Sequence, residues 1–387
     1  MEAALSRLEE AVEAHLVDLE RAEIERLKDG ADDSVLSGDD DVLPPENRSQ
    51  HLARLGDQLS RTAVQMTLLH NSVASGEASP SSVSPSMTSL ATDMLNHAAH
   101  LAKLTLGARV SHDGACYTRA IHRASEAVLE STRDLALTLN GRTGAVNPAN
   151  GARSYFLDAT HSSRTSRALM TTGMTWDAAN ALKSLPANNG AAVQREIDSC
   201  IYMLQDALDE LKDAIAVARE SNASGESSED APDAHAIPDD DDDDAFRSTA
   251  GGADLPTLIL ARAVINVCQL LLRKTSVRVA PLAENSSEGI AWADSLAAIA
   301  RDLSAASDDV AVAVDPLDVE ELRVAATALL SNGNLLAEKA LLFADEESRA
   351  WFAKCADKLQ TDANALFLLI GEGGDADVKA AAAAPNR

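Results

Sequence analysis

Apolar residues recur at steps of three and four along most of the chain, with charged residues between them, and this spacing predicts amphipathic helices. The clearest stripe consists of Val193, Ile197, Cys200, Ile201, Leu204, Leu208, Leu211 and Ile215. Before it, the Ser-Leu-Pro sequence at 184–186 ends an earlier helical pattern, and Asn188 and Asn189 are candidate caps. We predict a helix, a tight corner and a second helix here, which form a packing unit without catalytic groups.

The same spacing predicts helices on both sides of this stretch. Their approximate ranges are 2–29, 47–74, 86–106 and 115–139 before it, and 254–281, 288–313, 317–343 and 346–370 after it. Asp113 or Ser111 is a candidate cap for the helix at 115–139, Asp315 for that at 317–343 and Asp345 for that at 346–370. Aromatic residues make up only 3% of the chain while Ala and Leu dominate, which favours interlocking helices over sheets. The predicted fold class is all-α.

One further helical pattern precedes the corner and has an unusual composition. Its members are Tyr155, Ala159, Ser162, Ser166, Leu169, Gly173 and Trp176. We interpret them as a buried seam, because small residues let a neighbouring helix come close.

Breaks in periodicity divide the chain into two antiparallel helical bundles joined by an acidic linker. The predicted parts are an N-terminal amphipathic helix at 1–29, an acidic loop at 30–46, a bundle at 47–220, a disordered linker at 221–253, a bundle at 254–371 and a frayed tail at 372–387. The linker holds six consecutive aspartates, which repel one another and resist burial. The second bundle has four helices, and the helix at 2–29 is a candidate for its open slot.

Charge and cysteine usage narrow the classes of partner and compartment. The formal net charge is −28, which repels phosphate backbones and disfavours direct nucleic-acid binding. The four cysteines lie in different helical patterns, as expected of buried reduced thiols in the cytosol or nucleus. We expect no signal peptide, and the apolar run at 255–272 contains Arg262, Asn266 and Gln269, which favours a buried helix over a membrane span.

Candidate chemistry is sparse, and we predict no enzyme activity, metal or cofactor. His97, His100, His112, His122 and His161 are more typical of scattered surface or core residues than of a zinc site. Nucleophile, phosphate-loop and zinc-protease motifs are missing from the sequence. The candidate partner-binding residues are Leu5, Leu8, Val12, Leu16 and Leu19 on the first helix and the basic cluster Arg273, Lys274 and Arg278. Ser227 and Ser228 lie beside acids and are candidate phosphorylation sites.

Three segments resemble a known family. The first comprises Trp176, Leu182, Leu185, Pro186, Asn188, Asn189, Ala191, Ala192 and Val193, followed by Gln205, Asp206, Ala207, Asp209, Glu210 and Leu211. The second is the acidic segment before an apolar helix, and the third comprises Ser304, Asp308, Asp309, Val310, Ala311 and Pro316. Together they make residues 46–370 similar to the cyclin-D-binding protein family, the Grap- and cyclin-D-interacting proteins.

The resemblance implies an all-helical adaptor of the cytoplasm and nucleus, with two bundles like the four- and five-helix bundles of talin and vinculin. It also implies that the adaptor binds D-type cyclins and helix-loop-helix regulators and restrains cell-cycle progression and transcription. The alternative function, from another class, is a cytoskeletal or adhesion scaffold, because vinculin-type bundles bind actin and adhesion proteins. The fold class by itself does not separate the two functions.

Overall fold

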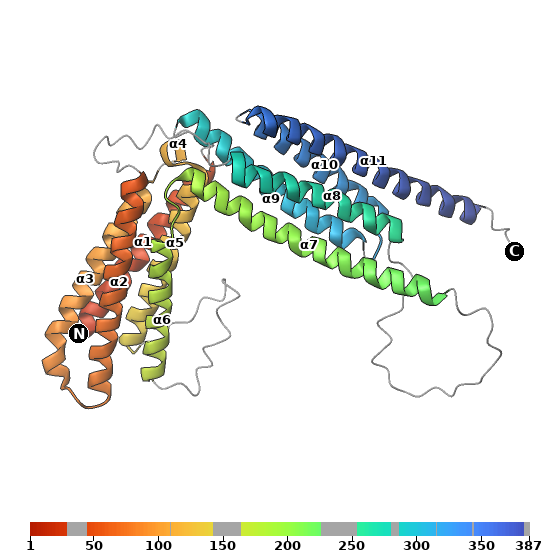
Figure 1. Cartoon of the computed structure of the whole chain (residues 1–387). Coiled ribbons are helices and arrows are strands. Elements are labelled where there is room, and N and C mark those ends of the chain that lie inside the picture. Colours follow the sequence, from red (N-terminus) through yellow and green to blue (C-terminus); the bar gives the residue numbers. More distant parts are fainter. Residues whose placement is uncertain are drawn as a thin grey trace, which may run out of the picture. The chain divides into compact units, whose positions relative to one another are not determined.

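The described chain consists of helices and falls into two compact units (Figure 1). A computed structural model describes residues 1–28, 45–108, 110–141, 164–225, 254–279, 286–314, 316–342 and 344–382. Within these ranges there is no strand, and the predicted all-α class is confirmed. Unit 1 comprises Met1–Ala192 and unit 2 comprises Val193–Arg387. Residues 30–44 of the predicted acidic loop and 226–253 of the predicted linker lie outside the described residues.

Unit 1 is built on five long helices and one short one. They are α1 (Glu2–Lys28), α2 (Pro45–Ala74), α3 (Pro80–Leu106), α4 (Val110–Asp113), α5 (Ala115–Leu139) and α6 (Arg164–Lys183). α1 packs on α3 and α5, α2 packs on α3 and α6, and α5 packs on α6, so each long helix has two principal neighbours. The resulting core is mainly aliphatic, and it also contains buried hydroxyl groups, Tyr117, His122 and the ion pair of Arg48 and Asp113.

Unit 2 contains α7 (Asn189–Gly225) from Val193 onward, α8 (Leu255–Lys274), a π-helical turn η3 (Thr275–Val279), α9 (Ser287–Val314), α10 (Val319–Leu341) and α11 (Glu346–Ala382). α8 packs on α9, α10 and α11, and Gln269 on α8 donates to the Ile201 carbonyl of α7 over 3.3 Å. Arg301 on α9 pairs with Glu196 on α7. Among the described helices α8, continued through η3, is the one long and apolar enough to cross a membrane, but it lies between its neighbours in unit 2.

The division between the units differs from the predicted one. It falls in the first turn of α7, whereas the sequence placed it at 221–253, and α1 belongs to unit 1 rather than filling a slot in the second bundle. Leu8 and Val12 of α1 are buried in unit 1, whereas Ile197 and Leu204 of α7 are buried in unit 2. An amphipathic stripe requires that a helix be covered but does not specify which neighbours cover it. The likeness of either unit to talin or vinculin bundles remains a prediction.

α3 begins earlier than its sequence suggests. The periodicity predicted a start near residue 86, but the serine- and proline-rich segment before that residue contains the first two turns of the helix. Ser79 caps the helix by accepting from the Ser82 amide, and Pro80 occupies the first helical turn, where its missing N–H costs nothing. Val83 and Met87 are buried, so packing offsets the cost of Pro85 within the helix.

The caps and ends of α10 and α11 can be compared with those that the sequence predicted. Asp345 caps α11 as predicted, since its carboxylate accepts from the Ser348 amide over 2.7 Å. α10 is capped by Asp318, which accepts from the amides of Glu320 and Glu321; Asp315, the cap that we predicted, lies outside the described residues. α11 continues to Ala382 instead of ending near residue 371, in keeping with the high helix propensity of its alanine-rich end.

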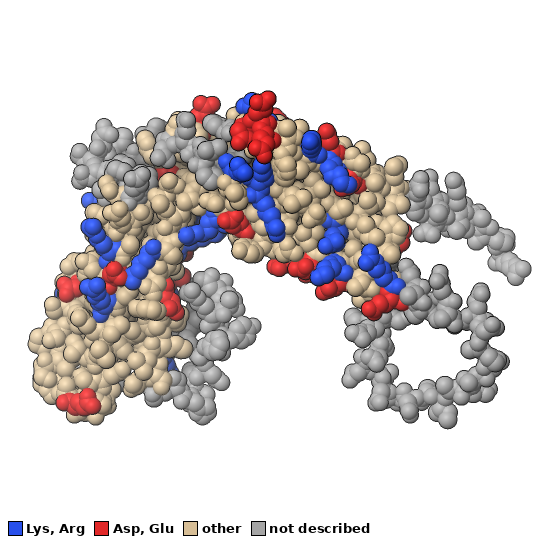
Figure 2. Space-filling view, viewed as in Figure 1, with Lys and Arg blue, Asp and Glu red and all other residues tan. Residues whose placement is uncertain are grey.

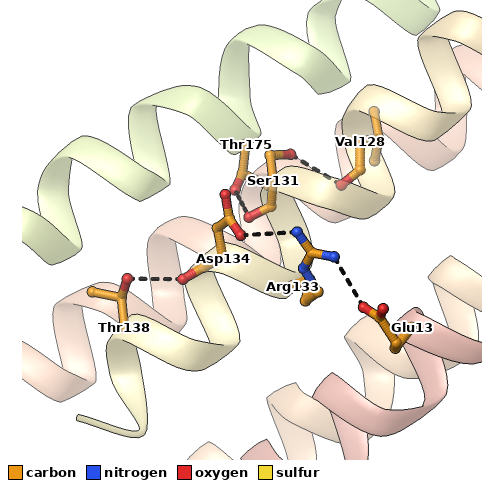
Figure 3. A network of polar contacts seen from close by, with 7 residues as sticks. All are labelled: Glu13, Val128, Ser131, Arg133, Asp134, Thr138 and Thr175. Carbon is orange, nitrogen blue, oxygen red and sulfur yellow. Dashed lines mark hydrogen bonds and ion pairs between the residues drawn. The ribbon is translucent and has the colours of Figure 1, made fainter. Parts of the chain in front are cut away.

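Figure 3 shows how α1 is held in unit 1 by polar contacts as well as by its apolar face. The Arg133 guanidinium on α5 donates to Glu13 on α1 over 2.9 Å and lies 3.6 Å from Asp134. On the opposite side of α5, the Thr175 hydroxyl of α6 donates to the Ser131 carbonyl over 3.1 Å. α5 is thereby joined to both of its neighbours.

α2 and α6 approach closely at Gly56. A Cβ at this position would lie 2.5 Å from the Ala179 carbonyl oxygen, which is backbone and cannot rotate away. We expect Gly56→Ala to lower the free energy of unfolding by about 2 kcal/mol, the usual cost of overpacking. Urea denaturation followed by circular dichroism measures the change. Gly173→Ala on α6 is the matched control, because a Cβ there meets nothing within 4 Å and alanine favours the helix. Equal stability losses in the two variants would contradict the close approach.

Candidate interaction surface

The predicted binding stripe of α1 is part of the core of unit 1. Leu5, Leu8, Val12 and Leu19 are buried, and Leu16 is half-buried. These residues contribute to stability by packing on α3 and α5 and do not form an accessible surface. The prediction that they meet a partner therefore requires α1 to leave unit 1, and no contact in the structure indicates such a step.

α6 is oriented with the row that we predicted to be buried facing outward. Leu169, Gly173 and Trp176, which we interpreted as part of a buried seam, are exposed, as is Ser166. The buried face of α6 consists of Ala168, Thr171, Thr172, Thr175, Ala179 and Leu182. The predicted orientation is wrong for this helix, while the first three members of the pattern, Tyr155, Ala159 and Ser162, lie outside the described residues.

Hydrogen bonds explain how a threonine face can be buried. The hydroxyl groups of Thr172 and Thr67 bond to each other across the α2–α6 seam, and Thr172 also reaches the Ala168 carbonyl over 2.6 Å. Thr175 bonds to the carbonyls of Ser131 and Thr171. Buried hydroxyls that are paired in this way avoid the desolvation cost of an unpaired polar group. The small inner face lets α6 sit close to α2 and α5 and leaves Leu169 and Trp176 outside, while Leu182 near the end of the helix is buried.

Four exposed apolar side chains gather on the outer side of the α2–α6 seam. Val64 and Leu68 on α2 are 40% and 62% exposed, and Leu169 and Trp176 on α6 are 55% and 50% exposed. Contacts between Gly56 and Ala179 and between Thr67 and Thr172 show that the two helices run antiparallel, which places the four residues at similar heights. In Figure 2 the part of unit 1 where the end of α2 meets the start of α6 is largely uncharged. We call these four residues the α2–α6 surface.

Positive charge borders the α2–α6 surface along α2. Arg54 and Arg61 are exposed and lie fourteen and seven positions before Leu68, on the same outward row of the helix. Asp57 lies between them but bonds to Lys183 of α6 over 2.5 Å, and this hydrogen bond lowers the pKa of its carboxyl. Within the described residues neither arginine makes an ion pair, so the border keeps a net positive charge.

The corner between α6 and α7 is a capping device for two helices. Asn188 caps α7, because its Oδ1 accepts from the Ala191 amide over 2.9 Å. Asn189 caps α5 instead, accepting from the Tyr117 amide over 3.1 Å. Gly114, the residue before α5, has φ of 83°, and a Cβ there would lie 2.1 Å from Asn189 Cγ. The sequence predicted both asparagines as caps, but the second serves a helix more than seventy residues away.

A buried ion pair lies beside this corner. Arg48 of α2 pairs with Asp113 of α4, and its guanidinium also donates to the Gly107 carbonyl over 3.2 Å. Both side chains are almost fully buried. Tyr117 is buried next to them, and burial raises the pKa of its phenol to about 12. Asp113 therefore anchors α4 to α2, and the N-cap position of α5, for which we predicted Asp113 or Ser111, is occupied by Gly114.

The predicted basic cluster of unit 2 is present, but its members contact residues of their own unit. The Lys274 ammonium lies 5.4 Å from the centre of the Trp351 ring, and Arg273 donates to Gln205. The pKa of the Asp345 carboxyl is lowered, chiefly by its hydrogen bonds to Ser348 and to a smaller extent by the positive charges of Arg278 and Lys274. The cluster thus serves contacts between α8, α7 and α11, and the two candidate phosphorylation sites, Ser227 and Ser228, lie outside the described residues.

Metal-ligating and nucleophilic groups are dispersed in the described part of the chain. No group of three or more His, Cys, Asp or Glu side chains there could hold a metal ion. The His97 ring bonds to the Asp93 carbonyl of its own helix, and His122 is buried. All four cysteines are free, and burial raises the pKa of Cys200 to about 11, which disfavours the reactive thiolate.

The fold and this surface define an all-α protein with an exposed apolar face on its N-terminal unit. Residues 51–216 match the family described as Grap2 and cyclin-D-interacting, N-terminal. The matched segment is similar to the N-terminal domain of this family, so the resemblance is confirmed over those residues. They contain the capping corner and all four members of the α2–α6 surface. No curated protein matches the chain.

Proposed function

We propose that this chain is a non-enzymatic adaptor of the cytoplasm and nucleus that binds D-type cyclins and helix-loop-helix regulators, and thereby restrains cell-cycle progression and transcription. We also propose that a partner docks on the α2–α6 surface. The family description, cyclin-D-interacting, supports the class of partner, and the matched residues contain this surface.

The orientation of α6 is the observation that carries the proposal. A helix ordinarily turns its large apolar residues inward, but α6 buries alanine and threonine, with Leu182 at its end, and exposes Leu169 and Trp176. A contiguous exposed apolar patch is typical of an interaction site, and tryptophan is enriched among the residues that dominate binding energy. A docked partner would bury the apolar side chains that unit 1 leaves exposed on this side.

Binding of the purified full chain to a D-type cyclin, measured by calorimetry, tests the proposal. We expect Trp176→Ala to weaken binding at least about 30-fold, equivalent to about 2 kcal/mol, because it removes a central anchor. Thermal unfolding of the variant should change little, since half of the side chain is already exposed. Leu368→Ala in unit 2 is the matched control, an exposed apolar residue of α11 that we expect to leave the affinity unchanged.

Two outcomes would overturn the proposal. Unaltered cyclin affinity in Trp176→Ala would move the binding site away from the α2–α6 surface. Co-sedimentation of the chain with actin filaments, together with no affinity for a D-type cyclin or a helix-loop-helix protein, would replace the adaptor function by the scaffold function.

A further inference from the structure

The α2–α6 surface has the spacing that a helix recognises. On α6, Leu169, Gly173 and Trp176 stand at positions i, i+4 and i+7, and on α2, Val64 and Leu68 stand at i and i+4. Each set forms one row along its helix, so the two adjacent helices present two exposed apolar rows, and we call the strip between these rows the furrow. A partner helix with apolar residues at the same intervals fits such a furrow, whereas an extended strand has the wrong repeat and finds no sheet edge here.

Gly173 gives the furrow room for close approach. A Cβ at this position meets nothing within 4 Å, so the glycine is not required by the packing of unit 1. In a helix interior glycine costs about 1 kcal/mol relative to alanine. Its place between the two exposed anchors of α6 leaves a gap in the ridge into which a side chain of a partner helix can insert.

The positive charges of Arg54 and Arg61 favour a partner helix whose facing edge is acidic. Arg54 and Arg61 line the α2 side of the surface without ion-pair partners among the described residues, while Asp57 is already compensated by Lys183. A helix with acidic residues along one edge would meet both guanidinium groups as it seats its apolar face. A second copy of the chain is disfavoured, because each copy carries a formal charge of −28.

From these observations we infer that the occupant of the α2–α6 surface is an amphipathic helix of a partner protein, with aliphatic anchors at helical spacing and an acidic edge facing Arg54 and Arg61. The inference rests on the proposed function, because it specifies the kind of segment that the adaptor captures. It also specifies the direction of the charge preference, which the apolar patch by itself does not.

Designed peptides test this inference on the full chain. One probe is an 18-residue amphipathic peptide with leucines at i, i+3, i+4 and i+7 spacing and glutamates along one edge. The second has lysine at each glutamate position, and the third has serine at each leucine position. Binding is followed by the blue shift of Trp176 emission, taken as the difference from Trp176→Phe, and by fluorescence anisotropy of labelled peptides.

We expect the glutamate-edged peptide to bind at least about tenfold more tightly than the lysine-edged one, and the serine peptide not to bind. Arg61→Glu should reverse the order of the two leucine peptides. Gly173→Gln should weaken both at least about fivefold without lowering the thermal midpoint, because it fills the gap from the outside. Equal binding of the two charged peptides, or no effect of Arg61→Glu, would overturn the acidic edge.

The outcomes separate this inference from the proposed function. If a D-type cyclin binds in a Trp176-dependent manner but no peptide does, the surface is correct and the helical occupant is wrong. If the glutamate-edged peptide binds but no cyclin does, the occupant's chemistry stands and the partner class fails. Dimerisation of the full chain in sedimentation velocity that Trp176→Ala abolishes would assign the surface to a second copy, and Trp176-dependent pelleting with phosphatidylserine vesicles would assign it to a membrane.

Discussion

Replacing Arg48 by alanine is expected to lower the free energy of unfolding of unit 1 by about 3–5 kcal/mol. The substitution leaves the Asp113 carboxylate in the interior without its guanidinium, and a buried charge that loses its partner keeps its full desolvation cost. The Gly107 carbonyl also loses a donor. Hydrogen exchange of amides in α2 and α5 measures the effect, because it reports on unit 1 separately from unit 2.

Arg54→Ala is the control for this prediction, since it removes the same side chain from the exposed face of the same helix and should change stability by less than about 0.5 kcal/mol. The double variant Arg48→Met, Asp113→Leu should recover part of the loss, because apolar side chains of similar size need no partner. If the amides of α2 and α5 are equally protected from exchange in Arg48→Ala and in Arg54→Ala, the ion pair of Arg48 and Asp113 does not hold α4 in place.

Gly114→Ala is expected to destabilise unit 1 by about 3 kcal/mol. Two effects add, because the backbone at φ of 83° disfavours any residue with a Cβ, and that Cβ would collide with the amide group of Asn189. Moving the amide away would also uncap α5, since Asn189 Oδ1 accepts from the Tyr117 amide. Urea denaturation, with hydrogen exchange of the first turn of α5, measures both consequences.

Gly76→Ala separates the two effects. Gly76 has φ of 78°, close to that of Gly114, but a Cβ there meets nothing within 4 Å, so this variant carries only the backbone cost of about 1 kcal/mol. Asn189→Ala should cost about 1 kcal/mol as a lost cap, and with Gly114→Ala the total should be less than the sum, because the alanine makes room for the new Cβ. Strict additivity would contradict the collision.

The capping corner shows what a sequence pattern reveals and what it leaves out. Two asparagines after a proline indicate a helix start, and Asn188 does cap the helix that follows it. Nothing in the sequence around Asn189 points to α5, because the partner amide at Tyr117 reaches it only after the chain has folded back. Gly114 is likewise explained only by the side chain that occupies the space of its absent Cβ.

The orientation of α6 illustrates the same limit for burial. Periodicity identified the helix and the row containing Leu169 and Trp176, but the assumption that the more apolar row faces inward is wrong here. Thr67 on α2 and the Ser131 carbonyl on α5 supply partners for the threonines of α6, which makes its other face the buried one. The candidate surface therefore could not be found without the neighbours of α6.

The sequence by itself determined the all-α class, the positions of most helices and the kinship carried by the segment around the corner at 184–193. Helical periodicity and caps are local properties, set by residues within a few turns of one another. Only the tertiary structure decided that α1 packs in unit 1, that α7 belongs to unit 2 and that Trp176 is exposed. Those outcomes depend on which amphipathic faces cover one another and which buried hydroxyls find partners, and both are contacts between residues far apart in the chain.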